Sequence, residues 1–152
     1  MATSIGDLQR IAREHGIHIN GIFLNDELPT RKPATGFYVF NLDHLHRNTP
    51  SGTHWVAAYC GPYDAIYLDT FGEPPTVGVE RFLKSRYGGY RYNGKQIQDL
   101  HSNMCGHFCL SFGAAMQNNS LEVGLVRAFF NWIKQFSPDT KKNDRILRSG
   151  GL

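Results

Sequence analysis

One stretch of the sequence, residues 103–119, constrains the fold more than any other. It reads NMCGHFCLSFGAAMQNN, and at helical spacing its apolar side chains lie most of the way round the helix. A helix of this kind has to be buried on nearly all sides, so the rest of the chain must pack around it. The sequence therefore predicts a central helix that begins near Cys105 and lies deep in one hydrophobic core.

The flanking segments predict an α+β domain around this helix. Ser4 followed by Asp7 is typical of the start of a first helix, Ser120 is expected to cap the last one, and Pro138 to end it. The expected elements are helices at 4–16, 78–88 and 120–136, strands at 37–43, 54–60 and 65–72, and an extended segment at 90–100. The turn signal GPYD joins the second and third strands into an antiparallel hairpin.

Length and composition narrow the class of protein. A chain of 152 residues favours a single domain over 1–152, with a flexible basic tail from about residue 138. Three cysteines are too few for a disulfide scaffold, so free thiols are expected. No apolar run approaches the roughly 18 residues of a membrane span, and the N-terminus does not resemble a secretory signal. We therefore expect an intracellular protein that is not secreted and has no membrane partner.

Three residues from separate segments have the chemistry of an activated cysteine. A thiol attacks a carbonyl as the thiolate, a histidine can take its proton, and a carboxylate can orient the imidazole. Cys105 is expected at the start of the central helix, where free N–H groups favour an anion. His54 opens one expected strand and Asp69 closes the next, so a hairpin can bring both to one edge. Gly106 would leave space for a substrate backbone.

An amide upstream of the cysteine can complete such a site. The side chain of Gln98, with the backbone N–H of Cys105, can bind a developing oxyanion. Gln96 is a rival, because alternation along an extended segment points both glutamines the same way. Each of the other residues also has a structural alternative: Cys105 can be a packing residue, His54 a satisfied buried histidine, and Asp69 the cap of a turn.

The ordered motifs GTHWVAAY, YLDTFG and QIQDLHSNMCGHFC resemble those of the adenain-like (adenovirus-type) cysteine proteases. The likeness covers roughly residues 20–117 and is closest to the proteases of Maverick-type transposons and related double-stranded DNA viruses. The wider group includes the SUMO-specific proteases. The resemblance implies a small mixed sheet packed against a central helix that carries the nucleophile. It assigns the nucleophile to Cys105, the general base to His54, the orienting acid to Asp69 and the oxyanion donor to Gln98.

The same resemblance implies a function. It predicts a cysteine endopeptidase (a thiol protease) that cleaves viral or element-encoded precursors at or near Gly-Gly for capsid or virion maturation. Trp55 would then line the approach to the nucleophile, and Gly106 would lie beside the substrate. A viral enzyme of this type would act in the virion and the host nucleus, as a monomer. No cofactor is required by the sequence; DNA and an activating viral peptide are candidate partners, although no cysteine clearly matches the one that binds adenain's peptide.

Other functions remain open at this point. A deconjugating protease acting on ubiquitin-like modifiers, an acyltransferase of the same broad group and a catalytically silent scaffold would all keep the fold. A zinc module would use Cys105, Cys109 and His101, with His44 and His46 in a loop. We expect no metal, because Cys109 falls one turn deeper in an apolar helix, where a buried cysteine is ordinary.

The C-terminal region carries a cluster of cations and a glycine pair. A solvated basic tail is one interpretation of the cluster, and contact with DNA phosphates is the other. Its members are Lys134, Lys141, Lys142, Arg145 and Arg148. The chain ends in RILRSGGL, so a cut before Leu152 would resemble the expected Gly-Gly specificity. The alternative is a flexible tail with no processing.

Overall fold

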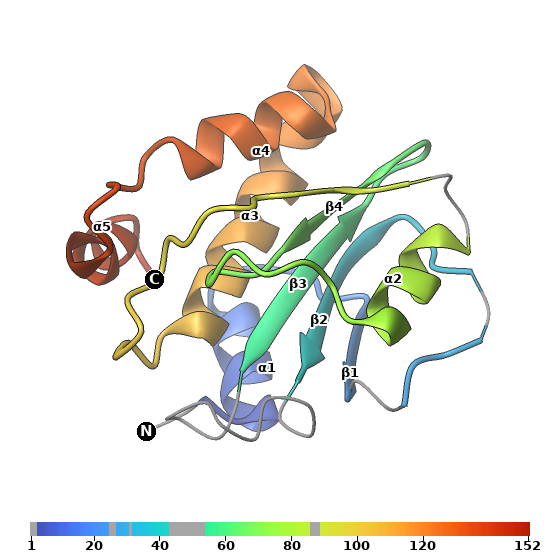
Figure 1. The fold of residues 1–152 in the computed structure, drawn as a ribbon, viewed down its shortest axis with the longest axis horizontal. Helices are drawn as coiled ribbons and strands as arrows, with labels where there is room; N and C mark the ends of the chain where they lie inside the picture. Colours follow the sequence, from blue (N-terminus) through green and yellow to red (C-terminus); the bar gives the residue numbers. More distant parts are fainter. Residues whose placement is uncertain (1–2, 25–26, 31, 43–53, 86–88) are drawn as a thin grey trace.

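The computed structural model describes residues 3–24, 27–30, 32–42, 54–85 and 89–152 as an α+β fold (Figure 1). Its sheet has the strand order β1-β2-β3-β4-β5, with β1 and β5 parallel to their neighbours and the three inner strands antiparallel. The strands are β1 (Gly21–Leu24), β2 (Gly36–Asn41), β3 (Trp55–Cys60), β4 (Ala65–Leu68) and β5 (Arg91–Tyr92). The α+β class and the mixed sheet predicted above are thus confirmed.

The central helix α3 (Cys105–Val123) packs against one face of the sheet. Its buried side chains, among them Phe108 and Phe112, share one core with the inward residues of β2, β3 and β4. Gly113 allows the close approach, because a Cβ there would lie 2.3 Å from the ring of Phe37 on β2. The helix that is apolar nearly all round therefore lies where its pattern predicted, in the core.

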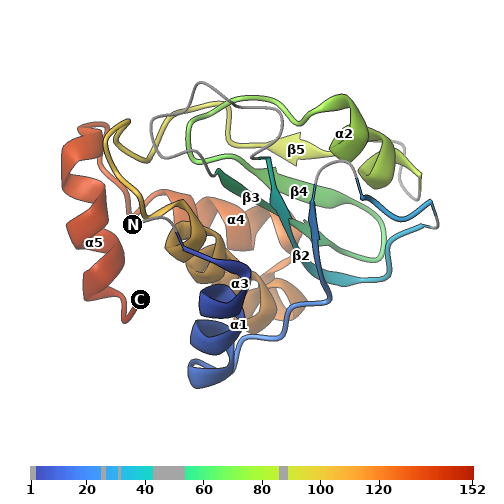
Figure 2. The same ribbon diagram turned by 90° about the horizontal axis from the view of Figure 1, so that it is seen from below.

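Helices cover both faces of the sheet. Helices α1 (Ile5–Glu14) and α4 (Leu125–Ile133) pack on α3, while α2 (Val77–Lys84) lies across the opposite face, as the view from below in Figure 2 shows. The predicted cap of α1 is confirmed, since the Asp7 N–H donates to Ser4 Oγ at 3.1 Å and the Ser4 N–H to Asp7 Oδ2 at 3.2 Å. None of the helices in the described ranges is long and apolar enough to cross a membrane.

Several predicted boundaries are wrong. Ser120 caps no helix, because α3 runs through it to Val123 and the break falls at Gly124. Gly124 has φ 85°, a conformation that favours glycine, and its N–H bonds the Ser120 carbonyl at 2.9 Å. Strand β1 was not predicted, and β4 ends at Leu68, short of residue 72. Predicted structure at 43 and 86–88, and the loop histidines His44 and His46, lie outside the described residues.

The C-terminal region is not the structureless tail expected from its composition. A 3-10 turn, η1 (Thr140–Lys142), leads into helix α5 (Asn143–Ser149). Asn143 and Leu147 are 0 % and 2 % exposed, and Leu147 belongs to the same core as α3. A single buried leucine and a buried amide are weak signals in a polar sequence, so the composition concealed a packed element.

Candidate active site

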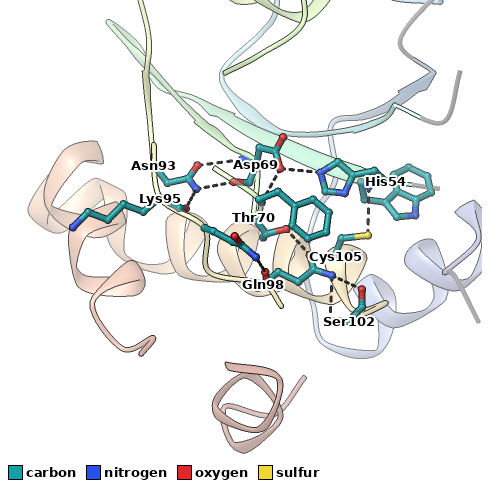
Figure 3. Close-up of polar contacts among 11 residues, drawn as sticks. His54, Asp69, Thr70, Asn93, Lys95, Gln98, Ser102 and Cys105 are labelled. Atoms are coloured by element: carbon teal, nitrogen blue, oxygen red, sulfur yellow. Dashed lines mark hydrogen bonds and ion pairs between the residues drawn. The ribbon is translucent and has the colours of Figure 1, made fainter. Parts of the chain in front are cut away.

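His54 and Asp69 meet at one end of the β3–β4 hairpin. His54 directly precedes β3 and Asp69 directly follows β4, and the antiparallel register brings these two ends together. His54 Nε2 and Asp69 Oδ1 are 2.8 Å apart (Figure 3). Both side chains are almost fully buried, so the pair is shielded from the solvent that weakens surface ion pairs.

Cys105 is the first residue of α3, and its sulfur faces the start of β3. The backbone N–H of Trp55, the residue after His54, lies 3.5 Å from Cys105 Sγ (Figure 3). No side chain caps the N-terminus of α3, so N–H groups of its first turn remain available to an anion. The predicted nucleophile, base and acid, which are far apart in the sequence, are thus brought to one place.

The protonation of His54 suits an ion pair with a thiolate. Burial alone would lower the pKa of His54, but hydrogen bonds and charge interactions with Asp69 and Cys105 outweigh it and raise the pKa to about 9 from an ordinary value of 6.5. The imidazole therefore carries its proton at neutral pH. With Nε2 bonded to Asp69, Nδ1 is the nitrogen left to exchange a proton with the cysteine.

Two residues that the sequence analysis missed hold this pair. The Phe71 N–H donates to Asp69 Oδ1 at 2.9 Å, and the Phe71 ring stacks on His54 with centroids 4.7 Å apart. Asn93, from another segment, makes two hydrogen bonds to the Asp69 backbone: its Oδ1 accepts from the Asp69 N–H at 3.2 Å, and its Nδ2 donates to the Asp69 carbonyl at 2.6 Å. The DTF sequence is a recognisable turn around the acid, but nothing local points to Asn93.

Gln98 lies inside the site and Gln96 does not. Gln98 is 0 % exposed; its Oε1 accepts from Thr70 Oγ1 at 2.5 Å, and its Nε2 donates to the Ser102 carbonyl at 3.0 Å and to Ser102 Oγ at 3.3 Å (Figure 3). Gln96 is exposed and donates to the Gln98 carbonyl. The alternation that would point both glutamines the same way is absent, because β5 ends at Tyr92 and the chain is irregular beyond it.

Trp55 and Gly106 are both buried beside the site. The Trp55 side chain is in the core, at 1 % exposure, and its Nε1 donates to the Thr3 carbonyl at 2.8 Å. A Cβ on Gly106 would lie 3.0 Å from Leu8 of α1. The missing side chain at Gly106 therefore makes room for the N-terminal region. The places of Trp55 and Gly106 beside a substrate stay predictions, because Cys105 and His54 are buried to a similar degree.

The zinc alternative finds no support in the part of the chain that is described. Among the described residues, no group of three or more histidine, cysteine or carboxylate side chains is arranged so that it could hold a metal ion. His101 is exposed in a turn, whereas Cys109 is fully buried one turn into α3. Burial raises the pKa of the Cys109 thiol well above its usual value, which keeps the sulfur protonated.

The five basic residues considered for DNA are all exposed but lie on different elements. Lys134 follows α4 with its Nζ 5.9 Å from the centroid of the Phe130 ring. The other four follow one another along η1 and α5, namely Lys141, Lys142, Arg145 and Arg148. This arrangement leaves DNA contact a prediction.

In space the three groups stand in the order acid, base and thiol, with the base in the middle. Asp69 holds His54, and His54 interacts with Cys105, the residue that begins the central helix. Gln98 is held beneath them by Thr70 and Ser102. Such an arrangement can activate a thiol for attack on a carbonyl.

No family model matches the chain, and no curated protein matches it either.

Proposed function

We propose that this protein is a cysteine endopeptidase with Cys105 as nucleophile, His54 as general base and acid, and Asp69 as the orienting acid. The observation that carries the proposal is the buried contact of 2.8 Å between His54 Nε2 and Asp69 Oδ1, with Cys105 beside the same imidazole. A structural histidine would be satisfied by the carboxylate alone. Here a thiol at the start of a helix also interacts with the imidazole, and this thiol is the nucleophile that attack on a peptide carbonyl needs.

In the proposed reaction the Cys105 thiolate attacks the carbonyl carbon of the scissile peptide, and the carbonyl electron pair moves to oxygen. His54 then gives its proton to the leaving amine as the C–N bond breaks, which leaves a thioester on Cys105. Neutral His54 removes a proton from water, whose oxygen attacks the thioester. Cys105 departs as the thiolate, and the product acid is released.

The oxyanion would be bound by the Gln98 amide and by backbone N–H groups at the start of α3. Gln98 Nε2 now gives its two hydrogens to Ser102, and its contact with Ser102 Oγ, at 3.3 Å, is the longer one. The hydrogen in that longer contact can be shared with an oxyanion while Ser102 Oγ keeps the amide in place. The α3 N-terminus, which has no side-chain cap, supplies the remaining donors.

The substrate that we propose is a viral or element-encoded precursor with Gly-Gly at the cleavage site, in keeping with the family resemblance. Burial of the site supports this choice. Cys105 and His54 are only 5 % and 2 % exposed, so a bulky residue next to the scissile bond would have to displace the walls of the site. Glycine brings a bare backbone. Processing of the chain's own Ser-Gly-Gly-Leu end belongs to the same proposal.

The test combines peptide hydrolysis with active-site labelling. Wild type is expected to cleave peptides with an internal Gly-Gly and to be labelled at Cys105 by a glycine-based vinyl sulfone. Cys105→Ala should do neither. Cys109→Ala, which removes a buried thiol one turn deeper, is the matched control and should keep both activities once its fold is verified. Hydrolysis that survives in Cys105→Ala, or a label on another residue, would disprove the assignment.

A further inference from the structure

The segment from Ile97 to Cys105 is attached to the C-terminal helix. Asn143, the first residue of α5, donates from Nδ2 to the Ile97 carbonyl at 2.7 Å. Its neighbour Asp144 accepts at Oδ1 from Ser102 Oγ at 2.8 Å. Both contacts join parts of the chain that are more than forty residues apart, and both end on the loop that holds the proposed oxyanion donor.

Ser102 connects Asp144 to the Gln98 amide. Its hydroxyl has one hydrogen, which goes to Asp144, and so its lone pairs face the Met104 N–H at 3.1 Å and Gln98 Nε2 at 3.3 Å. Without an acceptor at residue 144 the hydroxyl is free to rotate, and it can turn its hydrogen toward Gln98 instead of its lone pairs. Asp144 therefore determines whether Ser102 Oγ turns a lone pair or its hydrogen toward Gln98.

Asn143 holds the backbone of the same loop. It is 0 % exposed, its Oδ1 accepts from the Ser137 N–H at 2.7 Å, and its Nδ2 donates to the Ser137 carbonyl at 2.9 Å as well as to Ile97. The amide thus joins Ser137, within the α4–α5 connection, to the residue before Gln98. Asn143 secures the position of the loop, and Asp144 secures the orientation of one side chain within it.

We propose that Asp144 is a positioning residue for the reaction: through Ser102 it orients the Gln98 amide that binds the oxyanion, so α5 is part of the catalytic apparatus. The proposal rests on the proposed function. It requires a hydrogen-bond acceptor at residue 144, and not its charge, because the partner is a neutral hydroxyl. The proposal also predicts that only one of two reactions of Cys105 depends on Asp144. Acylation by a peptide passes through an oxyanion and should depend on it, whereas alkylation by iodoacetamide forms no oxyanion and should not.

Three variants, two at residue 144 and one at residue 122, test the first of these requirements. Asp144→Ala should lower kcat for a Gly-Gly peptide about tenfold, a partial loss of a donor whose removal costs about 10²–10³, with KM little changed. Asp144→Asn keeps an acceptor oxygen and should restore most of kcat. Glu122→Ala, which removes an exposed carboxylate near the C-terminal end of α3, is the matched control and should behave as wild type. The rate of iodoacetamide alkylation of Cys105 should be the same in all four proteins.

A double-mutant cycle with Gln98 tests the route. Gln98→Ala should cost about 10²–10³ in kcat, and Asp144→Ala added to it should cost little more, because the group it positions is gone. Full additivity, an Asp144→Asn variant as poor as Asp144→Ala, or an alkylation rate that falls with kcat would each overturn the proposal. Failure of the proposed function looks different: wild type itself would then show no hydrolysis that depends on Cys105.

Discussion

Replacing Asp69 by asparagine tests the basis of the proposed chemistry most directly. The pKa of His54 is raised from 6.5 to about 9 although burial opposes the rise. At about 1.4 kcal/mol for each tenfold change in the equilibrium, this corresponds to roughly 3 kcal/mol in favour of the protonated imidazole. Asp69, which bonds the ring at 2.8 Å, supplies a large share of it together with Cys105.

Asp69→Asn keeps the size of the side chain and removes its charge. The pKa of His54 should then fall toward or below 6.5, because burial is no longer outweighed. The loss of up to roughly 3 kcal/mol from the ion pair corresponds to a fall of about 10² in kcat/KM at pH 7. The alkaline limb of kcat/KM, expected in wild type near pH 9, should move to lower pH, since His54 must be protonated to release the amine.

The assay is hydrolysis of a Gly-Gly peptide from pH 5 to pH 10, with the His54 ring followed by NMR in the same samples. Asp64→Asn, which alters a partly exposed acid in the β3–β4 turn, is the matched control and should keep the wild-type profile. An Asp69→Asn enzyme whose alkaline limb and His54 titration stay where they are in wild type would refute the reasoning, because the carboxylate would then not control the imidazole.

The remaining predictions concern stability and packing. Because the pKa of His54 is raised in the folded state, the protonated ring contributes up to about 3 kcal/mol to the free energy of unfolding. This contribution is complete below pH 6.5 and is lost as the pH rises through about 9. The free energies of unfolding of wild type and His54→Gln, measured by chemical denaturation, should therefore converge over that range. Gly113→Ala should destabilise the fold by roughly 1–3 kcal/mol, because its Cβ would lie 2.3 Å from Phe37, whereas Gly89→Ala, with nothing within 4 Å, should be nearly silent in the same measurement. Phe71→Ala uncovers the His54 ring and should lower kcat/KM while leaving the melting temperature within a few degrees of wild type.

The sequence alone was enough to predict the structure where the contacts that determine it are local, or where the pattern of apolar residues is very strong. The cap of α1 depends on Ser4 and Asp7, which are three residues apart, and it is present as predicted. The burial of α3 follows from the apolar residues around most of its circumference. The hairpin that brings His54 to Asp69 depends on one turn, so its geometry was also predictable, and with it the centre of the candidate site.

The rest depended on partners that are distant in the sequence. Composition made α5 look like a loose tail, but Asn143 is buried because it meets Ile97, forty-six residues away. Asn93 serves Asp69 from another segment, and Trp55 is hidden because the Thr3 carbonyl satisfies its indole N–H. A buried polar group is stable only with its partner in place, and that partner is chosen by the tertiary fold. Residue types therefore established which chemistry is available, while long-range hydrogen bonds decided which side chains are held to perform it.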